Sequence, residues 1–79
     1  MDAIHIRTHG LADDESAALA EMSVYSLKGV AAAIAFKSLG VVSVLFYEDS
    51  TSAEDILRAV RVAGFEADIM HAELVPTAR

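Results

Sequence analysis

The order of strand-like and helix-like segments is the strongest constraint on the fold of this chain. Four short segments have the alternating or continuously apolar character of β-strands: Ile4–Thr8, Ala33–Lys37, Val41–Tyr47 and Ala67–Leu74. Between them, two segments repeat apolar residues at helical spacing: Asp13–Lys28 and Ser52–Ala63. The predicted order is therefore strand, helix, strand, strand, helix, strand.

Local signals at the segment ends agree with this order. Asp13 is a suitable N-cap for the first helix, and Gly29 follows that helix as a stop signal. Ser38-Leu39-Gly40 forms the turn of a hairpin, and Gly64 ends the second helix. The order βαββαβ predicts an α+β protein with a ferredoxin-like sandwich. We expect a four-stranded antiparallel sheet in the order 4-1-3-2, with two helices on one face and the other face open. The residues expected in the core are Leu11, Val24, Leu27, Val42, Val44, Ile56, Val60 and Ile69.

Composition bounds the class of protein. The 79 residues are 54% hydrophobic with a net charge of −6, which predicts one small folded domain over residues 1–75, with 76–79 as a tail or the start of a linker. The acidic balance argues against a nucleic-acid partner, because phosphate contacts need clustered Lys or Arg. The start Met1-Asp2-Ala3 is no signal peptide, and the longest apolar runs are too short to span a bilayer. We therefore expect a cytoplasmic protein without direct membrane insertion.

Several short motifs resemble the heavy-metal-associated (HMA) domain family, the small fold of copper chaperones and metal-pump N-termini. Leu27-Lys28-Gly29-Val30 is similar to the family's Leu-x-Gly-Val, and Ala63–Ala67 is similar to its Ala-Gly-Tyr-Glu-Ala. The family carries Gly-Met-x-Cys-x-x-Cys after its first strand, where this chain has Gly10–Ser16. Asp13 and Ser16 stand at the positions of the two cysteines. The resemblance implies the fold, while the CxxC metal motif is lost.

The segment around Asp13 has three possible roles. Its acids can cap the first helix and complement the helix dipole. Alternatively, His9 with the carboxylates of Asp13, Asp14 and Glu15 can form a site for Zn(II) or another divalent cation. A small-molecule role is the third. With no cysteine in the chain, we expect no Cu(I) site and no certain cofactor, and zinc is the ion expected if a metal binds.

Several apolar residues are also expected at solvent-exposed positions. They lie on the outer side of the first helix and on the open face of the sheet: Leu19, Met22, Tyr25, Val41, Leu45 and Tyr47. In Ala33–Lys37 the family register exposes Ile34 and Phe36, whereas a slip of one residue buries them. A contiguous apolar patch usually marks an interface, so we expect a protein partner or self-association.

These features favour a non-catalytic binding module that acts by protein–protein contact in metal transport or metal homeostasis. A specific form of this hypothesis is the N-terminal regulatory domain of a metal-transporting P-type ATPase, with the membrane transporter as partner. One alternative is a metal chaperone or sensor with His and carboxylate ligands. Another is a small-ligand-sensing regulatory domain, for which Gly10 in the first loop is suitable. No Ser-His-Asp set, phosphate loop or paired-carboxylate pocket indicates an enzyme.

Overall fold

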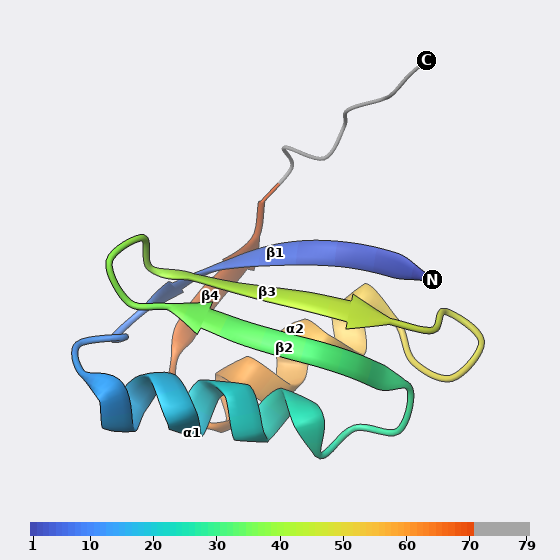
Figure 1. The fold of residues 1–79 in the computed structure, drawn as a ribbon, viewed down its shortest axis with the longest axis horizontal. Coiled ribbons are helices and arrows are strands. Elements are labelled where there is room, and N and C mark those ends of the chain that lie inside the picture. The colour runs from blue at the N-terminus through green and yellow to red at the C-terminus, as the bar shows by residue number, and fades with distance from the viewer. Residues whose placement is uncertain (71–79) are drawn as a thin grey trace.

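The computed structural model describes residues 1–70 and has the predicted order of elements (Figure 1). The six elements are β1 (Asp2–His9), α1 (Asp14–Tyr25), β2 (Val30–Phe36), β3 (Val41–Phe46), α2 (Ala53–Val62) and β4 (Glu66–Ile69). The continuation of the last strand to Leu74 and the tail 76–79 lie outside the described residues. Within the described part, no helix is long and apolar enough to cross a membrane.

The four strands form one antiparallel sheet in the order β2-β3-β1-β4, which confirms the predicted order. β1 lies at the centre, with Ile6 opposite Val42 of β3 and Ile69 of β4. Both helices cover one face of this sheet, as Figure 1 shows. No helix or strand of residues 1–70 covers the other face. The architecture is the predicted ferredoxin-like sandwich.

The core lies between the sheet and the two helices. Its largest completely buried side chains are Ile6, Val24, Val42, Val44, Ile56 and Val60. Burial of a side chain of this size contributes roughly 1.5–3 kcal/mol to folding. Leu27, also predicted for the core, is only partly buried and packs against its margin. The alternation along β3 predicted Val42 and Val44 correctly.

The register of β2 is the one that exposes its larger side chains. Ala33 is buried and Ala35 packs against the core, whereas Ile34 and Phe36 are 53% and 40% exposed. β2 lies directly against α1, so small side chains fit between the two elements. The carboxylate of Glu21 on α1 also accepts a hydrogen bond from the backbone N–H of Ala35 at 2.8 Å. These contacts hold the strand in this register and leave Ile34 and Phe36 on the open face.

Helix α1 ends earlier than the sequence pattern predicted. Tyr25 is its last residue, whereas the pattern extended to Lys28. Two serine hydroxyls near the end donate to backbone carbonyls one turn back, Ser23 to Ala20 and Ser26 to Ser23. Such local bonds compete with the helical ladder, and the chain leaves the helix through a turn to β2.

Candidate functional site

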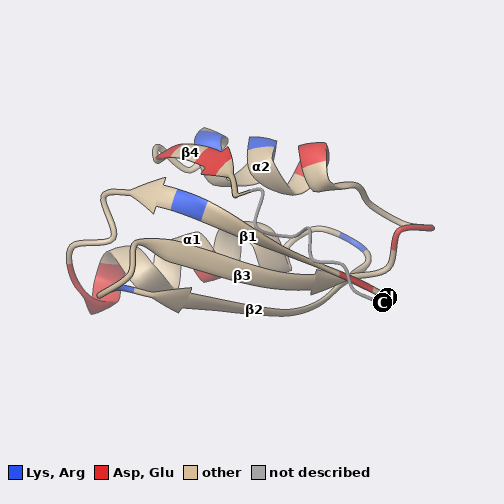
Figure 2. Cartoon of the chain, turned by 90° about the horizontal axis from the view of Figure 1, so that it is seen from above, with Lys and Arg blue, Asp and Glu red and all other residues tan. Residues whose placement is uncertain are grey.

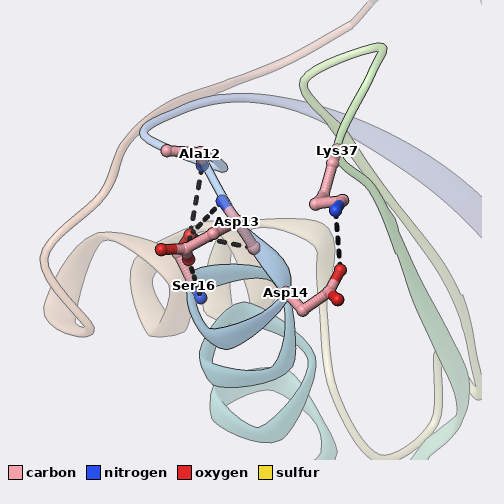
Figure 3. A network of polar contacts seen from close by, with 5 residues as sticks. All are labelled: Ala12, Asp13, Asp14, Ser16 and Lys37. Carbon is pink, nitrogen blue, oxygen red and sulfur yellow. Dashed lines mark hydrogen bonds and ion pairs between the residues drawn. The ribbon is translucent and has the colours of Figure 1, made fainter.

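The loop that connects β1 to α1 is closed by a reciprocal contact between Asp13 and Ser16 (Figure 3). Asp13 is the N-cap, and its Oδ1 accepts a hydrogen bond from the backbone N–H of Ser16 at 2.8 Å. The hydroxyl of Ser16 lies 2.7 Å from the same oxygen and also accepts from the backbone N–H of Asp13 at 3.1 Å. The two residues thus form a capping box. The positions at which the HMA family carries its cysteines are hydrogen-bonded to each other.

The acidic side chains at the start of α1 also have partners within the chain. Hydrogen bonds from the side chain and backbone of Ser16 lower the pKa of Asp13 below its ordinary value. Asp14 forms an ion pair with Lys37 at the end of β2, with 2.6 Å between Oδ1 and Nζ (Figure 3). This contact raises the pKa of Lys37. The two acids therefore have defined structural partners within the chain.

The remaining candidate metal ligands do not join these two acids in one cluster. His9 lies at the end of β1, in register with Glu66 of β4. Glu15 lies exposed in the first turn of α1. Among residues 1–70, no group of three or more His, Cys, Asp or Glu side chains is placed to hold a metal ion. The geometry of this region is that of a capped helix start.

The outer side of α1 carries a row of exposed apolar side chains. Leu19, Met22 and Tyr25 follow one another at i, i+3 spacing, and each is about half exposed or more. We call this row the helix surface. It begins one turn after the acids of the first turn, Asp14 and Glu15.

The open face of the sheet carries a second apolar surface. Tyr47 and four side chains of the β2–β3 hairpin form it, and we call them the sheet surface: Ile34, Phe36, Val41, Leu45 and Tyr47. Strands β2 and β3 contain no Lys, Arg, Asp or Glu and appear without charge colour in Figure 2. The surface is thus continuous and uncharged along two neighbouring strands.

A groove of about 360 Å³ lies between the two helices. Ser23 and Leu27 of the α1 side and Arg58 and Val62 of α2 are among its lining residues. It lies away from the Gly10–Ser16 loop, where the small-ligand alternative expected a site. Next to Gly10, the ring of Phe65 takes up the space, because a Cβ on Gly10 would lie 3.3 Å from it.

Comparison with known proteins gives structural matches only. No family model matches the chain, and no curated protein matches it. A copper binding domain from HMA7, a P-type ATPase, is 26% identical to this chain, with a TM-score of 0.86. The match covers 89% of this chain and 95% of that domain. The CopZ metallochaperone is 16% identical, with a TM-score of 0.82 and coverage of 85% and 100%. The Cu(I)-loaded N-terminal domain of a potential copper-translocating P-type ATPase from Bacillus subtilis is 22% identical, with a TM-score of 0.79 and coverage of 85% and 84%.

These matches define the class of fold and the setting in which it occurs. The similar structures are a metallochaperone and metal-binding domains of metal-transporting ATPases. The chain has the HMA fold and lacks the cysteine pair. The comparisons support a binding module in a metal-transport context.

The expectation of zinc, and against Cu(I), is wrong. The similar structures are described as copper-binding domains, one of them loaded with Cu(I), which associates this fold with copper rather than zinc. The physical reason lies in the loop itself. The carboxylate of Asp13 caps α1 and that of Asp14 pairs with Lys37, so two of the three carboxylates proposed for zinc have other partners.

Sequence reasoning missed the residues that complete this region. Lys37 is 23 positions after Asp14, and no local pattern links the two. Ser16 was identified only as the residue at a cysteine position, because the usual capping-box signal three residues after the N-cap is Glu or Gln and not Ser. Ile34 and Phe36 were left undecided between two registers, and the structure adds both to the exposed apolar residues.

Proposed function

We propose that this chain is a member of the HMA family that acts as a protein-binding module in copper transport, in contact with a copper pump or a copper metallochaperone. The proposal depends on a contrast between the loop before α1 and the outer side of α1 itself. The positions of the two family cysteines are closed by the Asp13–Ser16 pair, while an exposed apolar row begins one turn further along α1. A protein that retains the fold and a contact surface, with the thiolate pair replaced, is suited to docking.

The helix surface suggests the chemistry of the partner. Leu19, Met22 and Tyr25 offer a narrow apolar contact, and Asp13 and Glu15 lie exposed beside it. Asp14 is paired with Lys37 and Asp13 caps α1, which leaves the carboxylate of Glu15 for an incoming cation. The partner surface should therefore combine apolar side chains with Lys or Arg. An N-terminal regulatory domain of a copper-transporting P-type ATPase, located in the cytoplasm, is the specific form of this proposal.

Isothermal titration tests the proposal. The probes are the copper-binding domain of a P-type ATPase and the copper metallochaperone, both from the organism that encodes this chain. We expect saturable binding to at least one of them, weakened by salt because part of the contact is ionic. Absence of heat and of any amide shift with both probes at high micromolar concentration would contradict the proposal.

A further inference from the structure

The open face of the sheet places an imidazole opposite a thioether. Ile6 of β1 is completely buried on the helix side, so its neighbour His5 lies on the open face. The register of β1 with β4 pairs Ile6 with Ile69, and the next pair along is His5 with Met70. The backbone N–H of Met70 donates to the carbonyl oxygen of His5 at 2.9 Å, which continues this pairing. Because directly opposite residues share a face, with Cβ atoms about 4.5–5.5 Å apart, the two side chains can reach one ion.

The imidazole of His5 is held by a residue of the other neighbouring strand. Its Nδ1 lies 2.7 Å from Oγ of Ser43 in β3. The strands β3 and β4 flank β1 on opposite sides, and the two nitrogens of an imidazole point away from each other, so Nε2 is directed away from β3. When Nδ1 donates its proton to Ser43, Nε2 keeps the free lone pair that a metal ion needs. A hydrogen bond on the second nitrogen is the usual arrangement of a histidine that binds a metal.

The surroundings of this pair favour a soft ion over a hard one. On the β3 side, His5 borders a hollow of about 220 Å³ that is lined mainly by apolar side chains. The carboxylate next along the open face is that of Asp68, which is in register with Arg7 and accepts a hydrogen bond from Arg61 at 3.2 Å. That carboxylate is thus engaged by cations of the chain. What remains for an ion is a neutral nitrogen and a neutral sulfur, and thioether sulfur selects Cu(I) whereas oxygen ligands suit Mg, Ca and Mn.

We propose that Nε2 of His5 and Sδ of Met70 bind one Cu(I) ion on the open sheet face, with Ser43 as a positioning residue for the imidazole. The site is built on β1 and β4, away from the Gly10–Ser16 loop in which the HMA family carries its cysteines. His5 is exposed and Met70 is partly buried, so an ion can reach both from solvent. This inference goes beyond the proposed function and does not depend on it, because partner docking uses the helix surface, on the other side of the sheet.

Anaerobic competition with a chromogenic Cu(I) chelator tests the site in the full chain. We expect the wild type to take up one Cu(I). Met70→Leu should weaken binding about tenfold or more, because it removes the sulfur and nearly keeps the volume of the side chain. His5→Gln should weaken it by a similar factor, because an amide is a poor ligand for a soft ion. Equal affinity of either variant and the wild type would overturn the proposal.

Two variants of Ser43 test the positioning role. Ser43→Ala removes no metal ligand but frees the imidazole ring, and loss of such a supporting contact lowers metal affinity about 10–100-fold. Ser43→Thr keeps a hydroxyl group at this position and should bind Cu(I) nearly as tightly as the wild type. Equal affinity of Ser43→Ala and the wild type would show that the hydrogen bond to His5 does not orient a ligand.

Met22→Leu and His71→Gln are the matched controls. Met22 carries a thioether on the exposed side of α1, away from the sheet, and His71 follows Met70 in the sequence but lies outside the described residues. Both variants should bind Cu(I) as the wild type does, and circular dichroism should show that every variant is folded. A loss in either control equal to that in Met70→Leu would overturn the assignment.

NMR titration with Ag(I), a soft ion that does not change its oxidation state in air, gives a second readout. We expect the ring signals of His5 and the methyl signal of Met70 to shift together and to saturate at one ion per chain. Shifts confined to Met1 or Met22, or shifts that do not saturate, would show adventitious binding to exposed thioethers and would overturn the proposal.

Discussion

The carboxylate of Glu21 on α1 accepts a hydrogen bond from the backbone N–H of Ala35, at 2.8 Å, and occupies the outer edge of strand β2. At the opposite edge of the sheet, the guanidinium of Arg61 donates to the carbonyl oxygen of Ala67 in β4 at 2.8 Å. Unpaired strand edges recruit other strands, and charged side chains on an edge oppose this. Both edges of the sheet are therefore occupied by charged groups from the helices, while no helix or strand of the described residues covers its open face.

Removal of the Glu21 carboxylate should open the β2 edge. In Glu21→Ala the amide of Ala35 loses its acceptor, at a cost of about 1 kcal/mol, and its hydrogen exchange should become faster. Aggregation on prolonged incubation should increase, because β2 is apolar along its whole length. Glu21→Gln is the control, since its amide oxygen can still accept the bond. Unchanged exchange at Ala35 in Glu21→Ala would show that this bond does not protect the edge.

Loss of the N-cap should destabilise α1 in a pH-dependent way. Asp13→Ala should lower the thermal midpoint by about 4–8 °C at neutral pH. The pKa of Asp13 is lowered in the folded state from an ordinary value of 3.8, so its carboxylate stabilises the fold above that pH. The contribution is lost as the pH falls through the folded-state pKa. The difference in midpoint between wild type and variant should therefore decrease below about pH 4, and a constant difference would contradict this role.

Gly29 should not tolerate a side chain. Its φ is +97°, and a Cβ at this position would lie 2.6 Å from the Cβ of Ser50. Its carbonyl oxygen also accepts from the backbone N–H of Tyr47 at 2.8 Å, so the backbone cannot move without loss of that bond. Gly29→Ala should reduce the free energy of unfolding by about 2 kcal/mol or more, measured by urea denaturation. Gly64→Ala provides a control with the same strained φ of +108°, because nothing lies within 4 Å of its added Cβ. Equal losses of unfolding free energy in the two variants would show that the contact with Ser50 does not contribute to the effect.

Two cysteines placed at the positions of Asp13 and Ser16 should create a thiolate pair. The side chains of these residues already face each other across 2.7 Å, so two sulfurs at the same positions can reach one ion. Thiolates are the ligands that Cu(I) prefers. The double variant Asp13→Cys/Ser16→Cys should therefore bind one Cu(I) per chain more tightly than its parent in competition with a chromogenic chelator. Equal affinity in the two proteins would show that the loop no longer has the geometry of the family site.

The sequence predicted the fold because the relevant signals are local. Alternation in β3 identified Val42 and Val44 as buried, and Asp13 was expected as an N-cap; both hold in the structure. Contacts between distant segments carry no such signal. The ion pair of Asp14 with Lys37 and the bond of Glu21 to Ala35 depend on how α1 lies against β2. The register of β2 was undecided for the same reason, because packing against α1 selects the small alanines for the inner face.

The helix surface gives the most direct test of the central claim, that this chain acts by protein contact. The test variant is Met22→Lys, because Met22 lies at the centre of that surface and is 68% exposed. The control is Val62→Lys, because Val62 is 79% exposed but lies on α2. Calorimetric titration of each variant with the copper-pump domain and the metallochaperone then compares their affinities with that of the wild type. We predict a loss of about tenfold or more for Met22→Lys, because a lysine is desolvated at an apolar contact, and no change for Val62→Lys. Equal affinity of Met22→Lys and wild type for both probes would contradict the account.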